Sequence, residues 1–438
     1  MRFSKTLVLF AGTIPVFAQY AGPAILSRGE APAAMTAPQI DFRPYLEASG
    51  VYDTGLTGVT ANQQGDIAND HSYGAELTAG ISGVHSWKHT VLGLDYRGTY
   101  RHYAQQTYYD SSNQTLMLSL SHHFTKHISL TLQESAGMFS GTSGLFGLPQ
   151  TVQFDPSTNY VPTTDFYDDR TIYFSTGANL IYQKSTRLSF SFGGQGSLVR
   201  RRSSALYGVT GASARGDVQY RLTRHSTIGA MYAYTHYDYI GVFSGADVHM
   251  PALTYANRLS RWWELSAYAG ASRTESTFVR TVPLDPAIQA LLGVGYGNVV
   301  VYSIRYSPAA NIRISRTFSR GVAYVSGERT TTPGNGFFLT SLNTYANAGY
   351  TYTGLRRWSF GTNVSQNWGS SFGNLVGRYN TLSGGLTVTR QLAHATHFVA
   401  SLYATRYSSP DFTKYNRPVY MARIGLGFAP GEVPLRIW

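Results

Sequence analysis

The sequence contains no cysteine among its 438 residues, and only 13% of its residues are charged. Without cysteine there is neither a disulfide bond nor a thiolate metal site, although an oxidising compartment is still allowed. No segment approaches about 18 consecutive apolar residues, so no helical membrane span is expected. Hydrophobic residues make up 43% of the chain, which is below the usual share for a globular domain.

Long stretches of like charge are also missing. The chain carries 35 Lys and Arg against 23 Asp and Glu, which gives a formal net charge of +12. That balance would suit nucleic acid or an anionic membrane surface. However, there is no run of about five or more basic residues to serve as a nucleic-acid arm, so no nucleic-acid partner is expected.

The N-terminus has the pattern of a secretory signal peptide. Arg2 and Lys5 precede an apolar run, Leu7 to Ile14, which is too short to span a bilayer. Val16-Phe17-Ala18 then offers a cleavage site. The expected parts are a signal peptide at 1–18, a disordered Ala/Pro-rich lead-in at 19–41 and one folded domain at 42–438.

What the sequence has in abundance is alternation. Between residues 72 and 83, Tyr73 and Leu77 share one parity, whereas Glu76 and Thr78 share the other. Successive side chains of a strand point to opposite faces, so this stretch predicts a strand with one apolar and one polar face. The same pattern recurs at residues 90–103, 114–124, 128–136, 187–198 and 419–428.

About 18 such segments, each of about 10 residues, follow one another, and this length lets a tilted strand cross a bilayer. Their expected starts are residues 42, 72, 90, 114, 128, 171, 187, 209, 226, 248, 262, 300, 320, 338, 358, 378, 396 and 419. Pro251 and Pro308 make the tenth, twelfth and thirteenth strands the weakest of the set.

The connections alternate between short and long. Residues 125–127 and 184–186 are short connections, whereas 138–170 and 275–298 are long ones. Short turns at one end and long loops at the other are typical of an outer-membrane barrel. We therefore predict an all-β fold, a transmembrane antiparallel up-and-down β-barrel of about 18 strands (16–18).

A soluble all-β protein, such as a propeller or a stack of sandwiches, is the alternative fold. Its core would use more Val, Ile and Phe, and its outer face would carry Lys and Glu. Here the apolar faces mix Leu with Ala, Gly and Tyr, and the polar faces are mostly Ser, Thr, Asn, Gln and Gly. Aromatic residues also gather near the strand ends, as interfacial girdles do. They are Trp262, Trp263, Trp358, Tyr182, Tyr220, Tyr350 and Tyr352 near short turns, and Tyr73, Tyr100, Tyr234 and Trp368 near long loops.

With these features, residues 42–438 resemble a Gram-negative outer-membrane β-barrel of the porin-like kind. Leu284-Asp285-Pro286 through Leu292-Gly293 and the terminal Pro434-Leu435-Arg436-Ile437-Trp438 are similar to uncharacterised outer membrane β-barrel proteins of acidobacteria. The resemblance implies outer-membrane lipids and the outer-membrane assembly machinery as partners. It also implies that an aromatic residue ending the last strand is the assembly signal, for which both Phe428 and Trp438 are candidates.

If the polar parity faces a lumen, its charges are pore-lining candidates. They are Arg97, Arg101, Arg187, Arg215, Arg221, Arg305, Arg313 and Arg423, with Glu47, Glu76, Asp95, Asp217 and Glu264. Cations outnumber anions, and charged rings bias which ions pass, so we expect a weak anion preference. The alternative is that these groups pair with one another and stiffen the wall.

The longest loop, 138–170, is the third on the long side, a placement similar to that of the porin loop that narrows the channel. It carries Asp155, Asp165, Asp168 and Asp169, with no Lys or Arg before Arg170. An acidic loop opposite an arginine-bearing wall would set up a transverse field at a constriction. A surface loop is the alternative for this segment. Residues 286–292 predict a short helix in another long loop, either plugging the pore or packing on the rim.

Catalysis is not expected. There is no G-x-S-x-G motif and no His-x-x-x-His ligand pair, and His122 and His123 point to opposite faces of one strand. We expect no cofactor and no metal. The predicted function is an outer-membrane channel for passive diffusion of small polar solutes. The alternative is a non-conducting outer-membrane barrel associated with surface-polysaccharide export or envelope organisation. The oligomeric state is left open.

Overall fold

A computed structural model shows one closed barrel of 18 antiparallel strands, which confirms the predicted fold class. The structure describes residues 42–56, 70–105, 110–139, 170–202, 206–334, 336, 339–352, 354–372, 377–410 and 416–430. The strands are β1 (Arg43–Leu56), β2 (Asp70–Ser86), β3 (Thr90–Tyr103), β4 (Ser111–His123), β5 (Ile128–Phe139), β6 (Thr171–Gln183), β7 (Leu188–Arg201), β8 (Gly208–Arg221), β9 (Ser226–Ile240), β10 (Gly245–Arg258), β11 (Trp263–Pro283), β12 (Tyr296–Phe318), β13 (Gly321–Thr332), β14 (Ser341–Tyr352), β15 (Trp358–Ser371), β16 (Arg378–Gln391), β17 (Thr396–Ser408) and β18 (Arg417–Phe428).

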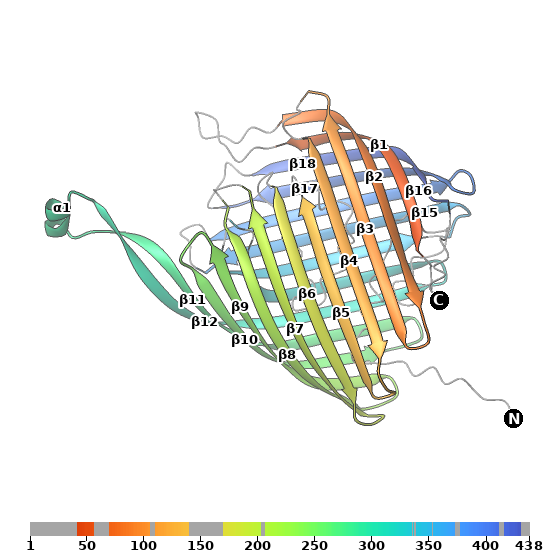
Figure 1. The fold of residues 1–438 in the computed structure, drawn as a ribbon, viewed down its shortest axis with the longest axis horizontal. Coiled ribbons are helices and arrows are strands. Elements are labelled where there is room, and N and C mark those ends of the chain that lie inside the picture. The colour runs from red at the N-terminus through yellow and green to blue at the C-terminus, as the bar shows by residue number, and fades with distance from the viewer. Residues whose placement is uncertain are drawn as a thin grey trace.

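Each strand pairs with its neighbours in the sequence, and β1 closes the barrel by pairing with both β2 and β18 (Figure 1). At the seam, Ser49 lies opposite Glu76 of β2, and Val51 lies opposite Arg423 of β18. An even number of strands returns the chain to the end where it entered. β1 therefore begins, and β18 ends at Phe428, on the side of the short turns.

The predicted strand starts lie within a few residues of the observed ones, including those of the strands that contain proline. Pro251 lies inside β10, opposite Tyr232 of β9. Pro308 lies opposite Ala271, in a part of β12 that pairs with β11 only. The pairing of β12 with β13 does not include residues of β12 before Ala310. A strand tolerates proline where no ladder hydrogen bond needs its missing N–H, as on this one-sided stretch.

The expected long loop at 275–298 is instead mostly a β-hairpin. β11 and β12 stay paired out to Pro283 and Tyr296, whereas β10 leaves β11 at the pair Gly245 and Thr277. Residues 278–301 thus form a two-stranded projection, which we call the arm (Figure 1). The arm is a correction to the sequence prediction, which had assigned these residues to an irregular loop.

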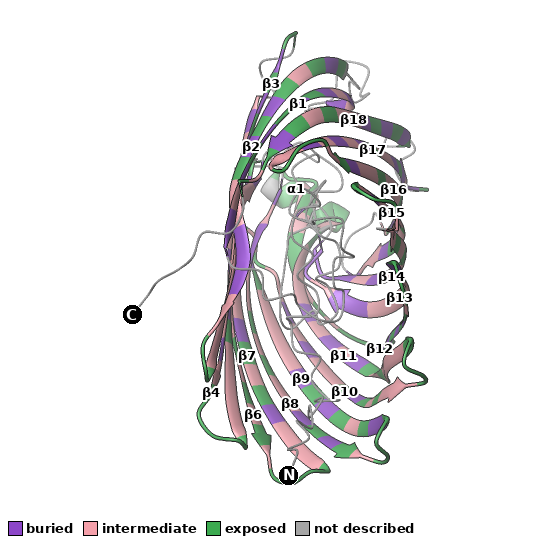
Figure 2. Cartoon of the chain, turned by 90° about the vertical axis from the view of Figure 1, so that its right-hand side faces the viewer, coloured by how far each residue is buried: buried purple, intermediate pink, exposed green. Residues whose placement is uncertain are grey.

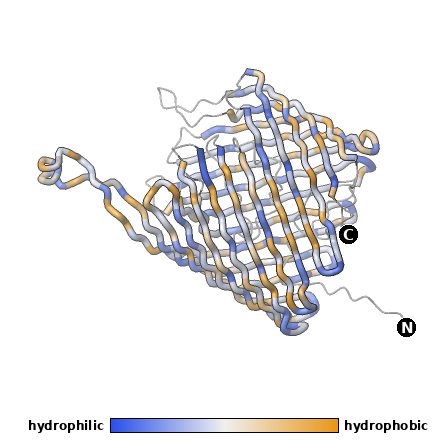
Figure 3. The backbone as a smooth tube through the Cα atoms, viewed as in Figure 1, coloured by the Kyte–Doolittle hydropathy of each residue, from blue (hydrophilic) through white to orange (hydrophobic). Residues whose placement is uncertain are grey.

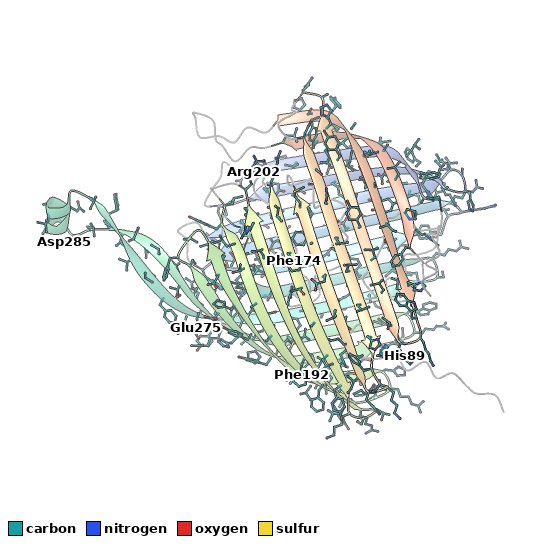
Figure 4. The ribbon with its side chains drawn as sticks, viewed as in Figure 1. His89, Phe174, Phe192, Arg202, Glu275 and Asp285 are labelled. Carbon is teal, nitrogen blue, oxygen red and sulfur yellow. The ribbon has the colours of Figure 1, made fainter. Side chains whose placement is uncertain are left out.

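The predicted short helix is confirmed as α1 (Pro286–Leu292), at the tip of the arm (Figure 4). The Asp285 side chain accepts a 2.9 Å hydrogen bond from the N–H of Ala287, and Gly293 ends the helix in the left-handed conformation with φ 68°. Because Leu291 is 84% exposed at this distal position, the helix neither plugs the pore nor packs on the rim.

The two faces of the wall differ sharply in polarity. On β2, Tyr73 and Leu77 are 66% and 50% exposed, whereas Glu76 and Thr78 on the other parity are 3% and 1% exposed. Apolar and polar residues alternate in this way along the strands (Figure 3), and exposed and buried residues alternate with them (Figure 2). The apolar side chains therefore lie outside, and the barrel encloses the polar ones.

The predicted aromatic girdle residues lie on that outer surface. Those with more than a third of their surface exposed are Trp262, Trp263, Tyr182, Tyr220, Tyr350, Tyr73, Tyr100 and Trp368. In the part of the chain that the structure describes, no helix has the length and apolarity needed to cross a membrane.

Candidate functional site: the interior of the barrel

The inner wall is lined by small polar side chains on the parity that strand alternation turns inward. Most are short enough to leave room for longer charged residues from neighbouring strands. Buried examples are Ser135, Ser175, Ser191, Gln195, Ser272, Thr274, Asn311 and Thr405. Several of them hydrogen-bond between strands, as Gln195 does by donating to Ser175 at 2.7 Å.

Charged residues concentrate at the seam where the barrel closes. On β3, the Nε–H of Arg101 donates a 2.9 Å hydrogen bond to Glu76 of β2. A second nitrogen of Arg101 donates to the Tyr103 hydroxyl at 3.2 Å, and that hydroxyl donates to Asp53 of β1 at 3.0 Å. This chain of contacts ties together the inner faces of β1, β2 and β3.

β18 joins the same group from the other side of the seam. Arg423 donates a 2.8 Å hydrogen bond to Glu76 and lies 3.6 Å from the carboxylate of Glu47. Glu76 therefore binds two guanidinium groups, one from β3 and one from β18. We call Glu47, Asp53, Glu76, Arg101, Tyr103 and Arg423 the seam cluster. Paired in this way, its charges compensate one another in a place from which bulk water is largely excluded.

A second ion pair lies on β8, where Arg215 donates hydrogen bonds of 2.8 Å to both carboxylate oxygens of Asp217. The hydroxyl of Ser191 on β7 donates to the same carboxylate at 2.9 Å. At the short-turn end, Arg258 likewise donates to Glu264 at 2.8 Å. For these groups and for the seam cluster, the geometry agrees with the alternative that wall charges pair with one another.

The other predicted pore-lining residues occupy varied positions. Arg97 and Asp95 lie on β3, on the same face as Arg101. Arg313 of β12 is buried, and its guanidinium carbon lies 5.0 Å from the ring centre of Tyr324. Arg221 is the last residue of β8. Arg305 is exposed on the one-sided stretch of β12, and Arg187 is exposed in the turn before β7. Arg187 thus lies at the rim and not on the wall.

A feature that the sequence did not indicate is a segment that folds inward between β13 and β14. Leu339 of this segment packs in a buried cluster with Phe139, Tyr173, Val199, Val209 and Tyr239. These five side chains belong to the inward parity of β5 to β9, far around the barrel from β13. We call residues 333–340, of which 335, 337 and 338 are not described, the inward segment.

Hydrogen bonds fix the inward segment to the wall. The Tyr239 hydroxyl donates to the carbonyl oxygen of Pro333 at 3.2 Å and lies 2.9 Å from the hydroxyl of Thr340. The N–H of Tyr207 donates to the carbonyl oxygen of Gly336 at 2.9 Å. Gly336 has φ 90°, and a Cβ there would collide with the side chain of Arg201, so glycine is required for this close approach.

The predicted constriction residues Asp155, Asp165, Asp168 and Asp169 lie outside the described residues, as do the signal peptide, the lead-in and Trp438. Among the described residues, the inward segment occupies part of the interior, where it contacts the wall. Its turn residues Pro333 and Gly334 were visible in the sequence, but turn residues do not reveal on which side of a barrel a loop folds.

Within the described part of the chain, no group of three or more His, Cys, Asp or Glu residues is arranged to hold a metal ion. The described inner wall presents ion pairs, hydroxyls and amides.

No protein-family model matches this chain, and no curated protein matches it significantly. The chain is similar in fold to two solved structures from Pseudomonas aeruginosa, OccK5 (OpdH) and OccK2 (OpdF). OccK5 has 14% identity and a TM-score of 0.41, with 89% of this chain and 98% of that chain covered. OccK2 has 12% identity and a TM-score of 0.42, with coverage of 89% and 97%. The E. coli K12 ferric-catecholate import receptor Fiu has 8% identity and a TM-score of 0.45, with coverage of 90% and 82%. These similar structures are Gram-negative outer-membrane β-barrels.

Proposed function

We propose that this chain is an outer-membrane channel through which small polar solutes diffuse, with a weak preference for anions. The observation that carries the proposal is the combination of an exposed apolar outer face with an enclosed polar inner face on the same 18 strands. An 18-strand wall is wide enough to enclose an aqueous passage. Hydroxyl and amide groups along that passage would hydrogen-bond a solute without holding it for long.

The weak anion preference rests on wall residues outside the seam cluster. Arg97 and Asp95 lie two residues apart on the same face of β3 and form a matched pair for testing it. Replacing Arg97 with Gln should lower the chloride-to-potassium permeability ratio, and replacing Asp95 with Asn should raise it. Reversal potentials in a KCl gradient measure this ratio. If neither substitution moved the reversal potential, the preference would not come from this part of the wall.

The inward segment favours the second candidate, a non-conducting barrel associated with surface-polysaccharide export or envelope organisation. An apolar cluster built around Leu339 inside the wall removes part of the cross-section from solute passage. In that case the long connections, rather than the interior, would carry the function.

Single-channel recording in a planar lipid bilayer separates the two candidates. The diffusion channel predicts steady steps of conductance from the purified chain. A silent bilayer would favour the non-conducting barrel, provided that a heat-dependent shift on a denaturing gel shows the barrel to be folded and that the chain floats with lipid vesicles.

A further inference from the structure

The rim formed by the short turns between β10 and β17 gathers arginines that are scattered along the sequence. Each lies in a turn or at the last residues of a strand, with its side chain exposed. The six residues, which we call the arginine rim, are Arg261, Arg316, Arg320, Arg356, Arg357 and Arg390. No Asp or Glu occurs in the stretches of sequence around these arginines, which are residues 259–263, 316–322, 350–358 and 388–396.

Several of these guanidinium groups are held against aromatic rings. The guanidinium carbon of Arg316 lies 5.1 Å from the ring centre of Trp263, its partner across β11 and β12, and 4.6 Å from that of Phe318. Arg390 lies 5.0 Å from the ring of Trp358, again a cross-strand partner. Stacking of this kind favours one orientation of the guanidinium plane.

The stacked arginines share the outer face with the apolar exterior. Arg316 has the same parity on β12 as Ile314 and Ile312, and Arg390 has the same parity on β16 as Leu386. All three aliphatic side chains are exposed. Going along these strands from the short turns, the surface therefore changes from guanidinium and indole groups to exposed hydrocarbon within a few residues.

We propose that the arginine rim binds the headgroups of anionic phospholipids, whose acyl chains lie on the outer face of β11–β16. This proposal rests on the membrane location in the proposed function, but not on conduction. The planar guanidinium fork matches two phosphate oxygens. The six cations complement a negative headgroup, since the nearby carboxylate of Glu264 lies on the opposite parity to Trp263 and is paired with Arg258. A lipid, unlike a free phosphate, also uses the adjoining apolar surface, so headgroup and chains have continuous sites.

The short turns elsewhere on the barrel provide an internal control. Lys126 in the turn after β4 and Lys184 in the turn after β6 are exposed cations at the same end of the barrel. Neither residue stacks on an aromatic ring in any contact that the structure gives. If only the summed charge of the rim attracted lipid, removing these two charges would matter as much as removing two from the arginine rim.

The test measures lipid retained by the purified full chain in detergent, using native mass spectrometry during titration with phosphatidylglycerol or phosphatidylcholine. We expect phosphatidylglycerol to bind at least about tenfold more tightly than phosphatidylcholine. The double variant Arg316→Gln/Arg390→Gln should lose at least about tenfold in affinity for phosphatidylglycerol, because two charge-assisted contacts to the headgroup are removed. The variant Lys126→Gln/Lys184→Gln should bind like the unmodified chain.

Equal binding of the two lipids, or an equal loss in both double variants, would overturn the proposal. A second arm adds inorganic phosphate at millimolar concentration. If phosphate displaced phosphatidylglycerol completely, the site would be one for free anions and not for lipid. The heat-dependent gel shift shows for each variant that the barrel is folded, so failure of lipid binding is distinguishable from failure of the membrane barrel itself.

Discussion

Arg423, on the last strand, donates a 2.8 Å hydrogen bond to Glu76 on the second strand, reaching across β1, which lies between them. In the register, Val51 lies opposite Arg423 and Ser49 lies opposite Glu76, so the contact passes over two short inward side chains of β1. Glu76 also receives the Nε–H of Arg101 from β3. The strands that come from opposite ends of the chain are thus joined by side chains as well as by the backbone ladder.

Replacing Glu76 with Gln should destabilise the closed barrel by about 3 kcal/mol, because two buried guanidinium groups lose their shared anion. Unfolding by urea of the chain reconstituted in lipid vesicles measures the change. The matched control is Asp238→Asn, since Asp238 is paired with His236 but its side chain is 65% exposed. This control should change stability by less than about 1 kcal/mol. Equal effects would mean that the seam cluster does not support closure.

Replacing Leu339 with Ala should loosen the inward segment. The side chain is 8% exposed in the cluster with Phe139 and Tyr239, and truncating a buried leucine costs about 2–5 kcal/mol. In single-channel recordings we expect a larger mean conductance with more frequent fluctuations. Leu386→Ala, on the outer face, should leave the conductance unchanged. A conductance insensitive to Leu339→Ala would show that the inward segment does not limit passage.

The arm should be dispensable for folding. Residues 280–299 can be replaced by Asn-Gly, a two-residue hairpin turn that joins the paired positions Val279 and Val300. None of the replaced residues pairs with β10 or β13, so the shortened chain should keep its heat-dependent gel shift and its conductance. Loss of the folded band would show that the arm contributes to barrel assembly.

Periodicity predicted the strands well because one face of each strand carries apolar side chains and the other carries polar ones. This alternation made the segment around Tyr73 and Leu77 recognisable as a strand. It also identified β10 and β12 as strands although they contain Pro251 and Pro308. The arm escaped prediction for the same reason. Both of its faces are exposed, as at Val299 and Val300, so its sequence lacks the alternation that a two-sided wall imposes.

The interior contacts were less predictable than the wall. Strand parity indicated that Arg101 and Glu76 face inward, but not that Glu76 binds arginines from both sides of the seam. The contact between Leu339 and Phe139 joins residues from distant strands, and no local pattern encodes it. The arginine rim likewise arises from topology, because its members come from four separate turns and the strand ends beside them.

Solvation of the outer face of the wall by hydrocarbon chains can be tested directly, because the chain contains no cysteine. Val364 and Ser365 are neighbours near the middle of β15, the first 52% exposed on the outer face and the second turned inward. A nitroxide attached to Val364→Cys or to Ser365→Cys in lipid vesicles reports its surroundings through collisions with dissolved oxygen, which concentrates in hydrocarbon, and with a water-soluble nickel chelate. A lipid-facing outer wall predicts strong oxygen and weak nickel accessibility at position 364, with a lower ratio of oxygen to nickel accessibility at position 365. Strong nickel accessibility at position 364 would contradict it.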